Sequence, residues 1–295
     1  VLSAPSLMTM TAPSDAELAW RALQDRLAEV FETPLRVFPV PTGTAANAVA
    51  LAASCTPFGA VYCSALAHIN TSECNATSFF GGGTKLVAVD GPHGKVDAKA
   101  LQDAILSAGV GLTHKNQPCA VNLVQATDMG AIYQIDELAA VSAVAHAHGL
   151  KVHMDGARFA NALVALGCSP AQASWRVGVD LLSLGVTKNG GLLTDAIVVF
   201  APDTAANIEF HLRRAGLVWS KMRFASAQIM ASRPWNVAPP ASACERERDE
   251  THRSDRDVED LGDLLVGESL DIGEQDGDAE LIGKRLDRLL DLGLG

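Results

Sequence analysis

The sequence predicts an α/β domain with a mostly parallel sheet covered by helices on both faces. Short apolar runs alternate with helical patterns, and the runs are almost continuously apolar, as in strands buried on both sides. Hydrophobic residues make up 48% of the 295 residues, which is enough for a sizeable core. Seven strands are predicted, at 37–40, 61–65, 85–89, 120–124, 150–154, 181–184 and 196–200.

Amphipathic patterns predict the helices. Residues 14–32 carry apolar side chains at helical spacing, and Ser14 can cap the start. Further helices are predicted at 97–107 with Asp97 as cap, at 135–147 ending at Gly149, and at 157–166 ending at Gly167. Such sheets bind ligands outside the carboxyl ends of their strands, so functional residues are expected there.

Composition divides the chain into four segments. These are an N-terminal segment and helix (1–33), a large domain (34–204), a connecting helix (205–231) and an acidic tail (232–295). The tail holds 17 acidic and 8 basic residues, against 17 and 15 before it, so most of the net charge of −11 belongs to the tail. Residues 232–257 lack apolar periodicity and are predicted to be disordered, whereas 278–292 have the pattern of one amphipathic helix.

Several function classes are disfavoured. No basic face indicates nucleic-acid binding, no run approaches the ~20 apolar residues of a membrane helix, and no secretory leader is recognisable. Six cysteines occur, and none is in a C-x-x-C pair, which argues against a zinc site and against a disulfide framework. A reduced, cytoplasmic location is therefore expected.

The first candidate functional motif at the end of a predicted strand is Pro41-Thr42-Gly43-Thr44-Ala45-Ala46-Asn47. A Gly-Thr turn that opens a helix offers free N–H groups, a hydroxyl and the positive end of the helix dipole, which suit a phosphate. An ordinary strand-to-helix turn with a threonine cap is an equally good interpretation of this motif alone.

The second is His153-Met154-Asp155-Gly156-Ala157-Arg158. Asp155 ends an apolar strand, where a carboxylate can pair with a protonated ring nitrogen. Gly156 would let a ligand approach the backbone, and Arg158 would bind an oxyanion of the same ligand. Taken alone, an aspartate helix cap beside a solvated arginine is the more usual interpretation.

The third is Ser183-Leu184-Gly185-Val186-Thr187-Lys188-Asn189-Gly190-Gly191. Lys188 follows an apolar strand in a glycine-rich turn, and a partly desolvated lysine is a competent amine for a Schiff base. A P-loop is excluded, because it requires G-x-x-x-x-G-K-[ST].

Four strings, PTGTAANAVAL, HINTSEC, HMDGARFANA and SLGVTKNGG, resemble motifs of the low-specificity L-threonine aldolases, which are fold type I pyridoxal-phosphate enzymes of the β-eliminating lyase superfamily. RRAGLVWSKMRFASAQ (213–228) also resembles a segment of that family, and the resemblance covers about two thirds of the chain. It implies pyridoxal 5'-phosphate as cofactor, a small amino-acid substrate and a homo-oligomer, a dimer or a tetramer.

The resemblance also implies roles for individual residues. Lys188 would be the Schiff-base lysine, Asp155 the partner of the pyridine nitrogen and Arg158 a contact on the oxygen side of the ring. The remaining implied cofactor contacts are Gly43 and Thr44 for the phosphate, His68 stacked on the ring, Gln125 and Thr127 at its border, and Lys221 at a phosphate. Glu73 is expected to have no more than an indirect role.

The implied reaction cleaves a β-hydroxy-α-amino acid, of the L-threonine or L-allo-threonine type, to glycine and an aldehyde. His68 is the expected base for the β-hydroxyl proton, and Asp155 keeps the ring nitrogen protonated. β-Elimination and transamination stay open, because the core motifs define the electron sink rather than the bond that breaks. A non-catalytic or impaired cofactor-binding remnant is the alternative from another class.

Two departures from the family motivate that alternative. Residues 1–14 lack stretches resembling S-D-N-x-x-G and Y-G-x-D, and after Ala231 no resemblance to the family's small domain is detected, so its substrate-binding arginine is not identified. Losing an arginine that pairs with the substrate carboxylate costs on the order of 1.5–3 kcal/mol of binding free energy. We interpret the change at Ala231 as a shifted reading frame or a wrongly joined gene model, which resequencing codons 228–236 would test.

Overall fold

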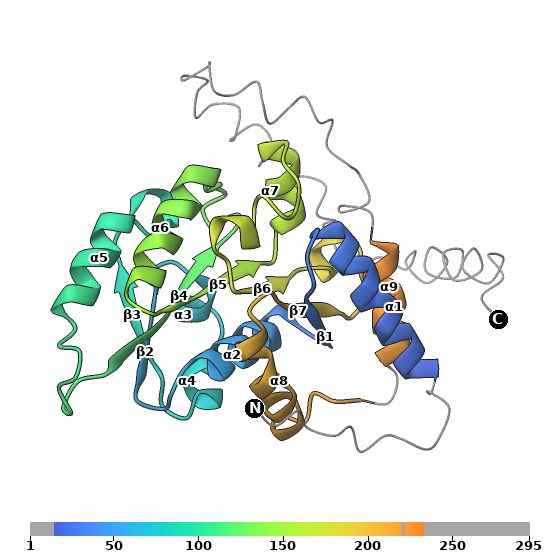
Figure 1. Cartoon of the computed structure of the whole chain (residues 1–295), viewed down its shortest axis with the longest axis horizontal. Coiled ribbons are helices and arrows are strands. Elements are labelled where there is room, and N and C mark those ends of the chain that lie inside the picture. Colours follow the sequence, from blue (N-terminus) through green and yellow to red (C-terminus); the bar gives the residue numbers. More distant parts are fainter. Residues whose placement is uncertain (1–14, 220–221, 233–295) are drawn as a thin grey trace, which may run out of the picture. The chain divides into compact units, whose positions relative to one another are not determined.

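The computed structural model describes residues 15–219 and 222–232, which belong to one compact unit. Within them, seven strands form one sheet in the order β1-β7-β6-β5-β4-β2-β3 (Figure 1). The strands are β1 (Arg36–Val40), β2 (Gly59–Ser64), β3 (Lys85–Val89), β4 (Gln117–Val124), β5 (Lys151–Gly156), β6 (Leu181–Leu184) and β7 (Asp195–Val199). The expected α/β class and mostly parallel sheet are confirmed.

Strand direction determines which residues meet at the sheet edge. β7 runs antiparallel to both of its neighbours, β1 and β6, whereas β6, β5, β4, β2 and β3 are parallel. The carboxyl ends of β1, β5 and β6 therefore lie at one edge, and the amino end of β7 lies at that same edge.

Helices cover both faces of this sheet (Figure 1). α2 contacts β4, β5, β6 and β7 on one face, with α4 and α8 packed beside it. On the other face, α5, α6 and α7 contact β3 and β5, and α1 packs against α9 next to β1. The helices are α1 (Asp15–Val30), α2 (Gly43–Ser54), α3 (His68–Thr71), α4 (Ala76–Phe80), α5 (Ala98–Ser107), α6 (Ile135–Ala147), α7 (Phe159–Leu166), α8 (Pro202–Arg214) and α9 (Met222–Ala231).

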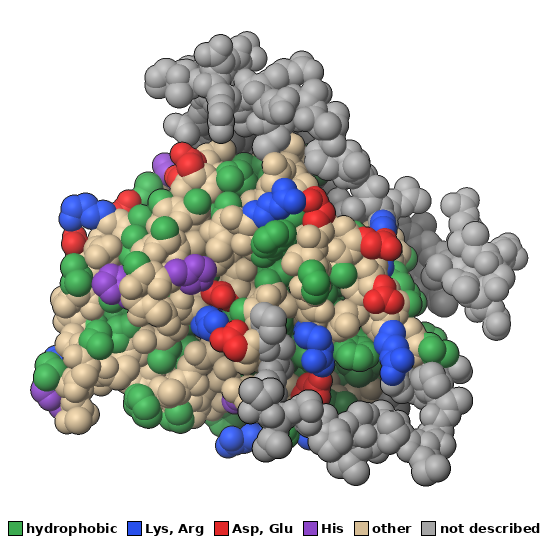
Figure 2. Space-filling model, in the orientation of Figure 1, with side chains coloured by type: hydrophobic (Ala, Val, Ile, Leu, Met, Phe, Trp, Pro, Cys, Tyr) green, Lys and Arg blue, Asp and Glu red, His purple; other side chains and the backbone are tan. Residues whose placement is uncertain are grey.

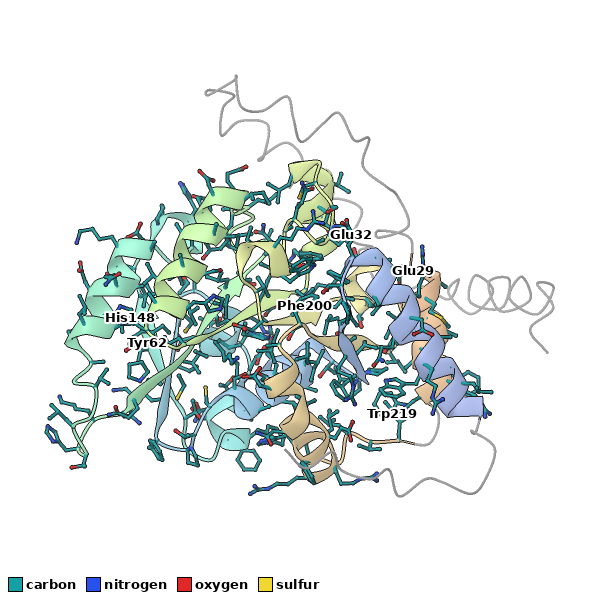
Figure 3. The ribbon with its side chains drawn as sticks, viewed as in Figure 1. Glu29, Glu32, Tyr62, His148, Phe200 and Trp219 are labelled. Atoms are coloured by element: carbon teal, nitrogen blue, oxygen red, sulfur yellow. The ribbon has the colours of Figure 1, made fainter. Side chains whose placement is uncertain are left out.

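The main hydrophobic core lies between the sheet and the α1, α5, α6 and α7 side. Phe31, just after α1, packs its ring against Phe200 at 5.3 Å and Phe159 at 6.2 Å between centroids; Phe200 is labelled in Figure 3. Along β5, Val152 and Met154 belong to this core, so the intervening side chains point to the α2 face. Strand alternation thus places Asp155 beneath α2.

Local signals explain most of the helix boundaries. Asp97 caps α5 by accepting from Ala100 N, as the sequence predicts, and Gly167 ends α7 with a φ of 61°. α7 begins at Phe159 rather than at 157. The expected connecting helix over 205–231 is two helices instead, because the chain turns at Gly216 with a φ of 72°.

Other expectations lie outside the described residues: the Ser14 cap, Lys221, and the disorder and helix of the tail. Within the described part of the chain, no helix is both long and apolar enough to cross a membrane. On the face shown in Figure 2, lysine and arginine side chains are interspersed with aspartate and glutamate.

Candidate active site

A cavity of about 330 Å³ lies at the sheet edge where β1, β5 and β6 end. Ligand pockets usually have volumes of roughly 300–1,000 Å³. Six of the residues predicted from the sequence line this cavity: Gly43, Thr44, His68, Asp155, Arg158 and Lys188. Asn47, Asp128, Ser183 and Asp195, for which the sequence suggested no role, are also among the lining residues.

The amino terminus of α2 forms one wall. Thr42 is the N-cap, and its hydroxyl accepts from Ala45 N at 3.1 Å. The N–H groups of Gly43 and Thr44, in the first turn, have no acceptor within the helix. A threonine cap and an anion site are therefore compatible: the Thr42 hydroxyl caps the helix, while Thr42, Gly43 and Thr44 all line the cavity.

Asp155 is a buried carboxylate held by two donors. Asn47 Nδ2 donates to its Oδ2 at 2.8 Å, and Ala157 N donates to its Oδ1 at 3.0 Å. Burial raises the pKa of Asp155, and these two hydrogen bonds partly oppose that effect. Among the described residues, Asp155 forms no ion pair with a lysine or arginine, although it lines the cavity.

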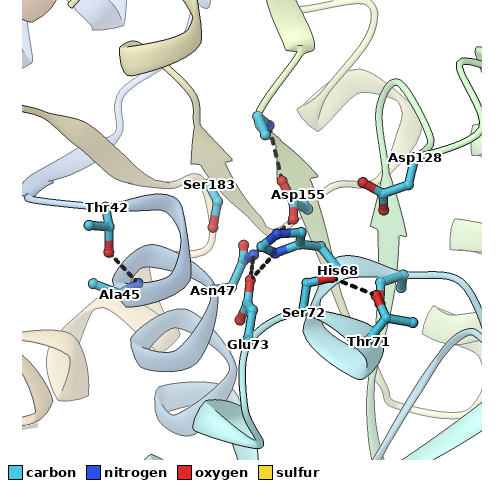
Figure 4. Close-up of polar contacts among 12 residues, drawn as sticks. Thr42, Ala45, Asn47, His68, Thr71, Ser72, Glu73, Asp128, Asp155 and Ser183 are labelled. Atoms are coloured by element: carbon cyan, nitrogen blue, oxygen red, sulfur yellow. Dashed lines mark hydrogen bonds and ion pairs between the residues drawn. The ribbon is translucent and has the colours of Figure 1, made fainter. Parts of the chain in front are cut away.

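Asn47 connects Asp155 to a second buried carboxylate (Figure 4). Its Nδ2 also donates to Glu73 Oε1 at 2.8 Å, and the same oxygen lies 2.9 Å from His68 Nδ1. The Glu73 side chain is fully buried, and burial raises its pKa, while hydrogen bonds from His68 and Asn47 act in the opposite direction. Asn47 Oδ1 and Glu73 Oε2 are buried without a partner in the described chain.

This arrangement orients His68. Glu73 accepts at Nδ1, so a neutral His68 carries its proton there and leaves Nε2 as the free acceptor. The His68 side chain is 38% exposed, and the ring lies beside Asp155 in Figure 4. The hydrogen bond at Nδ1 makes Glu73 an orienting group for His68, and Glu73 also lines the cavity.

Lys188 lies in a 3₁₀ turn, Thr187–Asn189, that Asp195 fixes to β7. Asp195 Oδ1 accepts from Val186 N at 2.7 Å and from Thr187 N at 3.0 Å. We expected Lys188 to be partly withdrawn from water, but the residue is exposed while it lines the cavity. Its neighbours Leu192 and Leu193 on the cavity wall are 74% and 77% exposed, so little apolar surface covers the amine.

Two glycines allow the loops after β5 and β6 to pack closely. A Cβ on Gly185 would lie 2.5 Å from Ala157 O, and a Cβ on Gly156 would lie 2.6 Å from Leu182 Cδ1. Gly156 thus serves packing within the sheet rather than the ligand approach that we expected. Arg158 forms an ion pair with Asp128 in the cavity lining, with 3.8 Å between Nη1 and Oδ1.

Gln125 and Thr127 do not line the cavity, contrary to expectation. The fully buried amide of Gln125 is occupied by the backbone of Tyr133: Nε2 donates to its carbonyl at 3.0 Å and Oε1 accepts from its N–H at 2.9 Å. The hydroxyl of Thr127 donates to His93 O and accepts from Ala131 N. Both side chains hold loops in place.

A polar row lies beneath Asp155 on the same face of the sheet. Asn122 Nδ2 is 2.8 Å from His153 Nδ1, and His153 Nε2 is 2.9 Å from Ser183 Oγ. Complete burial lowers the pKa of His153 to about 3, so this histidine is neutral at physiological pH. Ser183 links the row to the cavity.

A second cavity, of about 560 Å³, lies elsewhere and is lined by Ile69, Asn70, Asn75, Ser78, Gly83, Thr84, Lys85 and Leu86. Lys85 is the one ionisable group in that lining, so the larger space lacks acid–base partners. The chemistry of the described chain is concentrated in the smaller cavity.

The fold and this cavity define an α/β protein with a ligand site at the carboxyl ends of parallel strands. A family model for beta-eliminating lyases matches residues 14–265, which extends past Ala231 into the stretch where we detected no resemblance. The chain belongs to the beta-eliminating lyase family.

Individual relatives are similar over much of their length. The chain is 41% identical to the low specificity L-threonine aldolase of Pseudomonas aeruginosa over 252 residues, covering 85% of this chain and 70% of that protein. It is 40% identical to the enzyme of the same name from Pseudomonas sp. over 211 residues, covering 72% of this chain and 59% of that protein. A solved structure of Leishmania major threonine aldolase superposes with a TM-score of 0.67 at 25% identity, covering 78% and 67%.

Proposed function

We propose that this chain is a pyridoxal-phosphate-dependent lyase that cleaves β-hydroxy-α-amino acids of the threonine type to glycine and an aldehyde. One observation carries the proposal: the amine of Lys188, the carboxylate of Asp155 and the first turn of α2 converge on one cavity. The 41% identity to a low specificity L-threonine aldolase supports the type of reaction.

The residues present suit pyridoxal phosphate. Asp155 is a buried carboxylate with two hydrogen-bond donors and no cationic side chain paired to it in the described chain, which matches a protonated ring nitrogen. Gly43 and Thr44 would hold the phosphate at the positive end of α2. Lys188 would bind the aldehyde carbon, and Arg158 would contact the oxygen side of the ring.

When bound, the cofactor supplies an electron sink for the bond that breaks at the substrate α-carbon. Asp155 would keep the ring nitrogen protonated, and the Asn47 amide favours the ionised form of Asp155 and holds the carboxylate in place. His68 Nε2 removes the proton from the β-hydroxyl group, while Glu73 at Nδ1 stabilises the resulting imidazolium. Lys188, in the turn whose backbone Asp195 anchors, would supply the amine that holds the cofactor aldehyde.

We propose that the active form is a homo-oligomer, as the resemblance implies. The wall of the cavity includes Leu192 and Leu193, whose large exposure in a single chain would be reduced by a second copy. Light scattering on the purified chain tests this directly, and a monomer with full activity would contradict it.

The reaction is tested by purifying the full chain with pyridoxal phosphate and measuring aldehyde and glycine released from L-threonine, L-allo-threonine and phenylserine. We expect release from at least one of them, abolished by Lys188→Ala. A visible cofactor band without release from any of the three would instead favour the impaired remnant. Keto acid formation in place of glycine would favour transamination.

A further inference from the structure

Two cysteines that are far apart in sequence meet at the edge of the sheet opposite the cavity. Cys55 is the C-cap of α2, whose first turn faces the cavity, and Cys119 lies near the amino end of β4, whose carboxyl end is at the cavity edge. Both are free and partly buried. Neither takes part in the proposed lyase chemistry.

An irregularity in the sheet directs Cys119 toward Cys55. Ala60 pairs with Pro118 and Val61 pairs with Ala120, so Cys119 is an extra residue in β4, opposite no residue of β2. Such a bulge changes the direction of a side chain. The Cys119 sulfur packs directly on Gly59, where an added Cβ would lie only 2.5 Å from Sγ. The glycine therefore makes room for the thiol.

The turn between α2 and β2 surrounds this sulfur with polar groups. Thr56 Oγ1 lies 3.9 Å from Cys119 Sγ, and the backbone of Thr56 and of Ala60 lies close enough to favour a thiolate at that sulfur. The Cys55 thiol is within hydrogen-bonding reach of the same atom. When protonated, Cys119 donates to Gln117 O at 3.3 Å.

These contacts make the two thiols unequal. The Cys55 thiol and the backbone donors stabilise a Cys119 thiolate and lower the pKa of Cys119 to about 5, against the opposing effect of burial. The hydrogen bond to Cys119 and burial raise the pKa of Cys55. By contrast Cys63, in the neighbouring strand β2, has burial alone acting on it, and its pKa rises to about 12. Thiolate character and a resolving thiol are the features of oxidation-sensitive cysteine pairs.

We propose that Cys119 and Cys55 form a site of reversible oxidation, in which Cys119 reacts with hydrogen peroxide and Cys55 then closes a disulfide. The Cys119 thiolate attacks one peroxide oxygen, the O–O bond breaks, Cys119 becomes a sulfenic acid, and the leaving hydroxide takes up a proton to form water. The Cys55 sulfur then attacks the Cys119 sulfur, the S–S bond forms, the S–O bond breaks, and a second water leaves with the Cys55 proton. Peroxide is reduced, two thiols are oxidised, and an external dithiol reverses the change.

The test uses the full reduced chain, hydrogen peroxide and peptide-resolved mass spectrometry. We expect one peptide pair, containing Cys55 and Cys119, that is lighter by two hydrogen atoms and returns to the free thiols with dithiothreitol. In Cys55→Ser the reaction should stop at the first step, so that dimedone labels Cys119. In Cys63→Ser, the matched control in the adjacent strand, the Cys55–Cys119 disulfide should form as in the unmodified sequence.

A second measurement needs no variant to fold. The rate of iodoacetamide alkylation at Cys119 in the unmodified chain should rise with pH around a midpoint well below the value of an ordinary cysteine, which titrates near about 8.5. In folded Cys55→Ser this midpoint should move upward. A midpoint at the ordinary value, or peroxide oxidation at Cys74 and the other cysteines without a Cys55–Cys119 disulfide, would overturn the proposal.

Discussion

Replacing Asn47 by alanine should destabilise the folded chain more at high pH than at low pH, in the absence of any cofactor. Its amide donates to two buried carboxylates, Asp155 Oδ2 and Glu73 Oε1, each at 2.8 Å. Hydrogen bonds to charged groups contribute about 1.5–3 kcal/mol each. Because protonation can relieve part of the loss, we expect the variant to lose about 3 kcal/mol of unfolding free energy near pH 8.

The pH dependence follows from the direction of the pKa shifts. Asp155 and Glu73 already have raised pKa values in the folded chain, and removing a shared donor raises them further. An acid with a higher pKa in the folded state than in the unfolded state binds its proton more tightly when the chain is folded, so it stabilises the folded chain at low pH. This stabilisation is lost as the pH rises from the unfolded-state pKa through the folded-state pKa. The destabilisation by Asn47→Ala should therefore be smaller by about 1–2 kcal/mol near pH 5 than near pH 8.

Urea unfolding at both pH values measures the effect, and Asn122→Ala is the matched control. Asn122, on β4, is a buried asparagine like Asn47, but its partner is His153, which is neutral at both pH values because its pKa is about 3. The control should lose the same free energy near pH 5 and near pH 8. Equal pH dependence in the two variants would refute the assignment of Asn47 as a donor that favours the ionised form of both carboxylates.

Three further substitutions test the site. Asp155→Asn should weaken pyridoxal-phosphate binding by about 10- to 100-fold, since it removes a charge-assisted pair worth about 1.5–3 kcal/mol, and equilibrium titration measures this. His68→Asn should lower kcat by about 10²- to 10⁴-fold with a much smaller change in cofactor affinity; equal losses of both would contradict its role as the base. Asp195→Asn should slow covalent attachment of the cofactor to Lys188, because the backbone N–H groups of Val186 and Thr187 lose a charged acceptor. Stopped-flow absorbance measures this rate, and an unchanged rate would mean that Asp195 only stabilises the fold.

Much of the fold could be predicted because strands that are buried on both faces of the sheet are almost continuously apolar in the sequence. The apolar runs at 85–89 and 181–184 coincide with β3 and β6, and the α6 pattern gives its observed bounds of Ile135–Ala147. The break in the connecting helix was missed, since an isolated glycine inside a helical pattern can be tolerated and does not by itself mark the end of a helix.

Site residues were predicted where a sequence motif follows the end of a strand. They were missed where their place in the site depends on the orientation of a strand or on contacts with distant segments. Asp195 starts an apolar strand, and only the antiparallel orientation of β7 brings it to the turn of Lys188. Asn47 had a local signal, because it lies one turn after Gly43 on α2, but its partners come from segments far along the chain. Gln125 was placed at the cavity in error because the motif does not show that its amide pairs with the Tyr133 backbone.

The most direct test of the account is to trap the cofactor on the protein. The purified chain is incubated with pyridoxal phosphate, reduced with borohydride, digested and examined by mass spectrometry, with Lys188→Ala treated in parallel. We predict one pyridoxyl group, on the peptide that contains Lys188, and none on the variant. Labelling of other lysines at the same level in both proteins, or no labelling at all, would contradict the assignment of Lys188 and with it the proposed lyase chemistry.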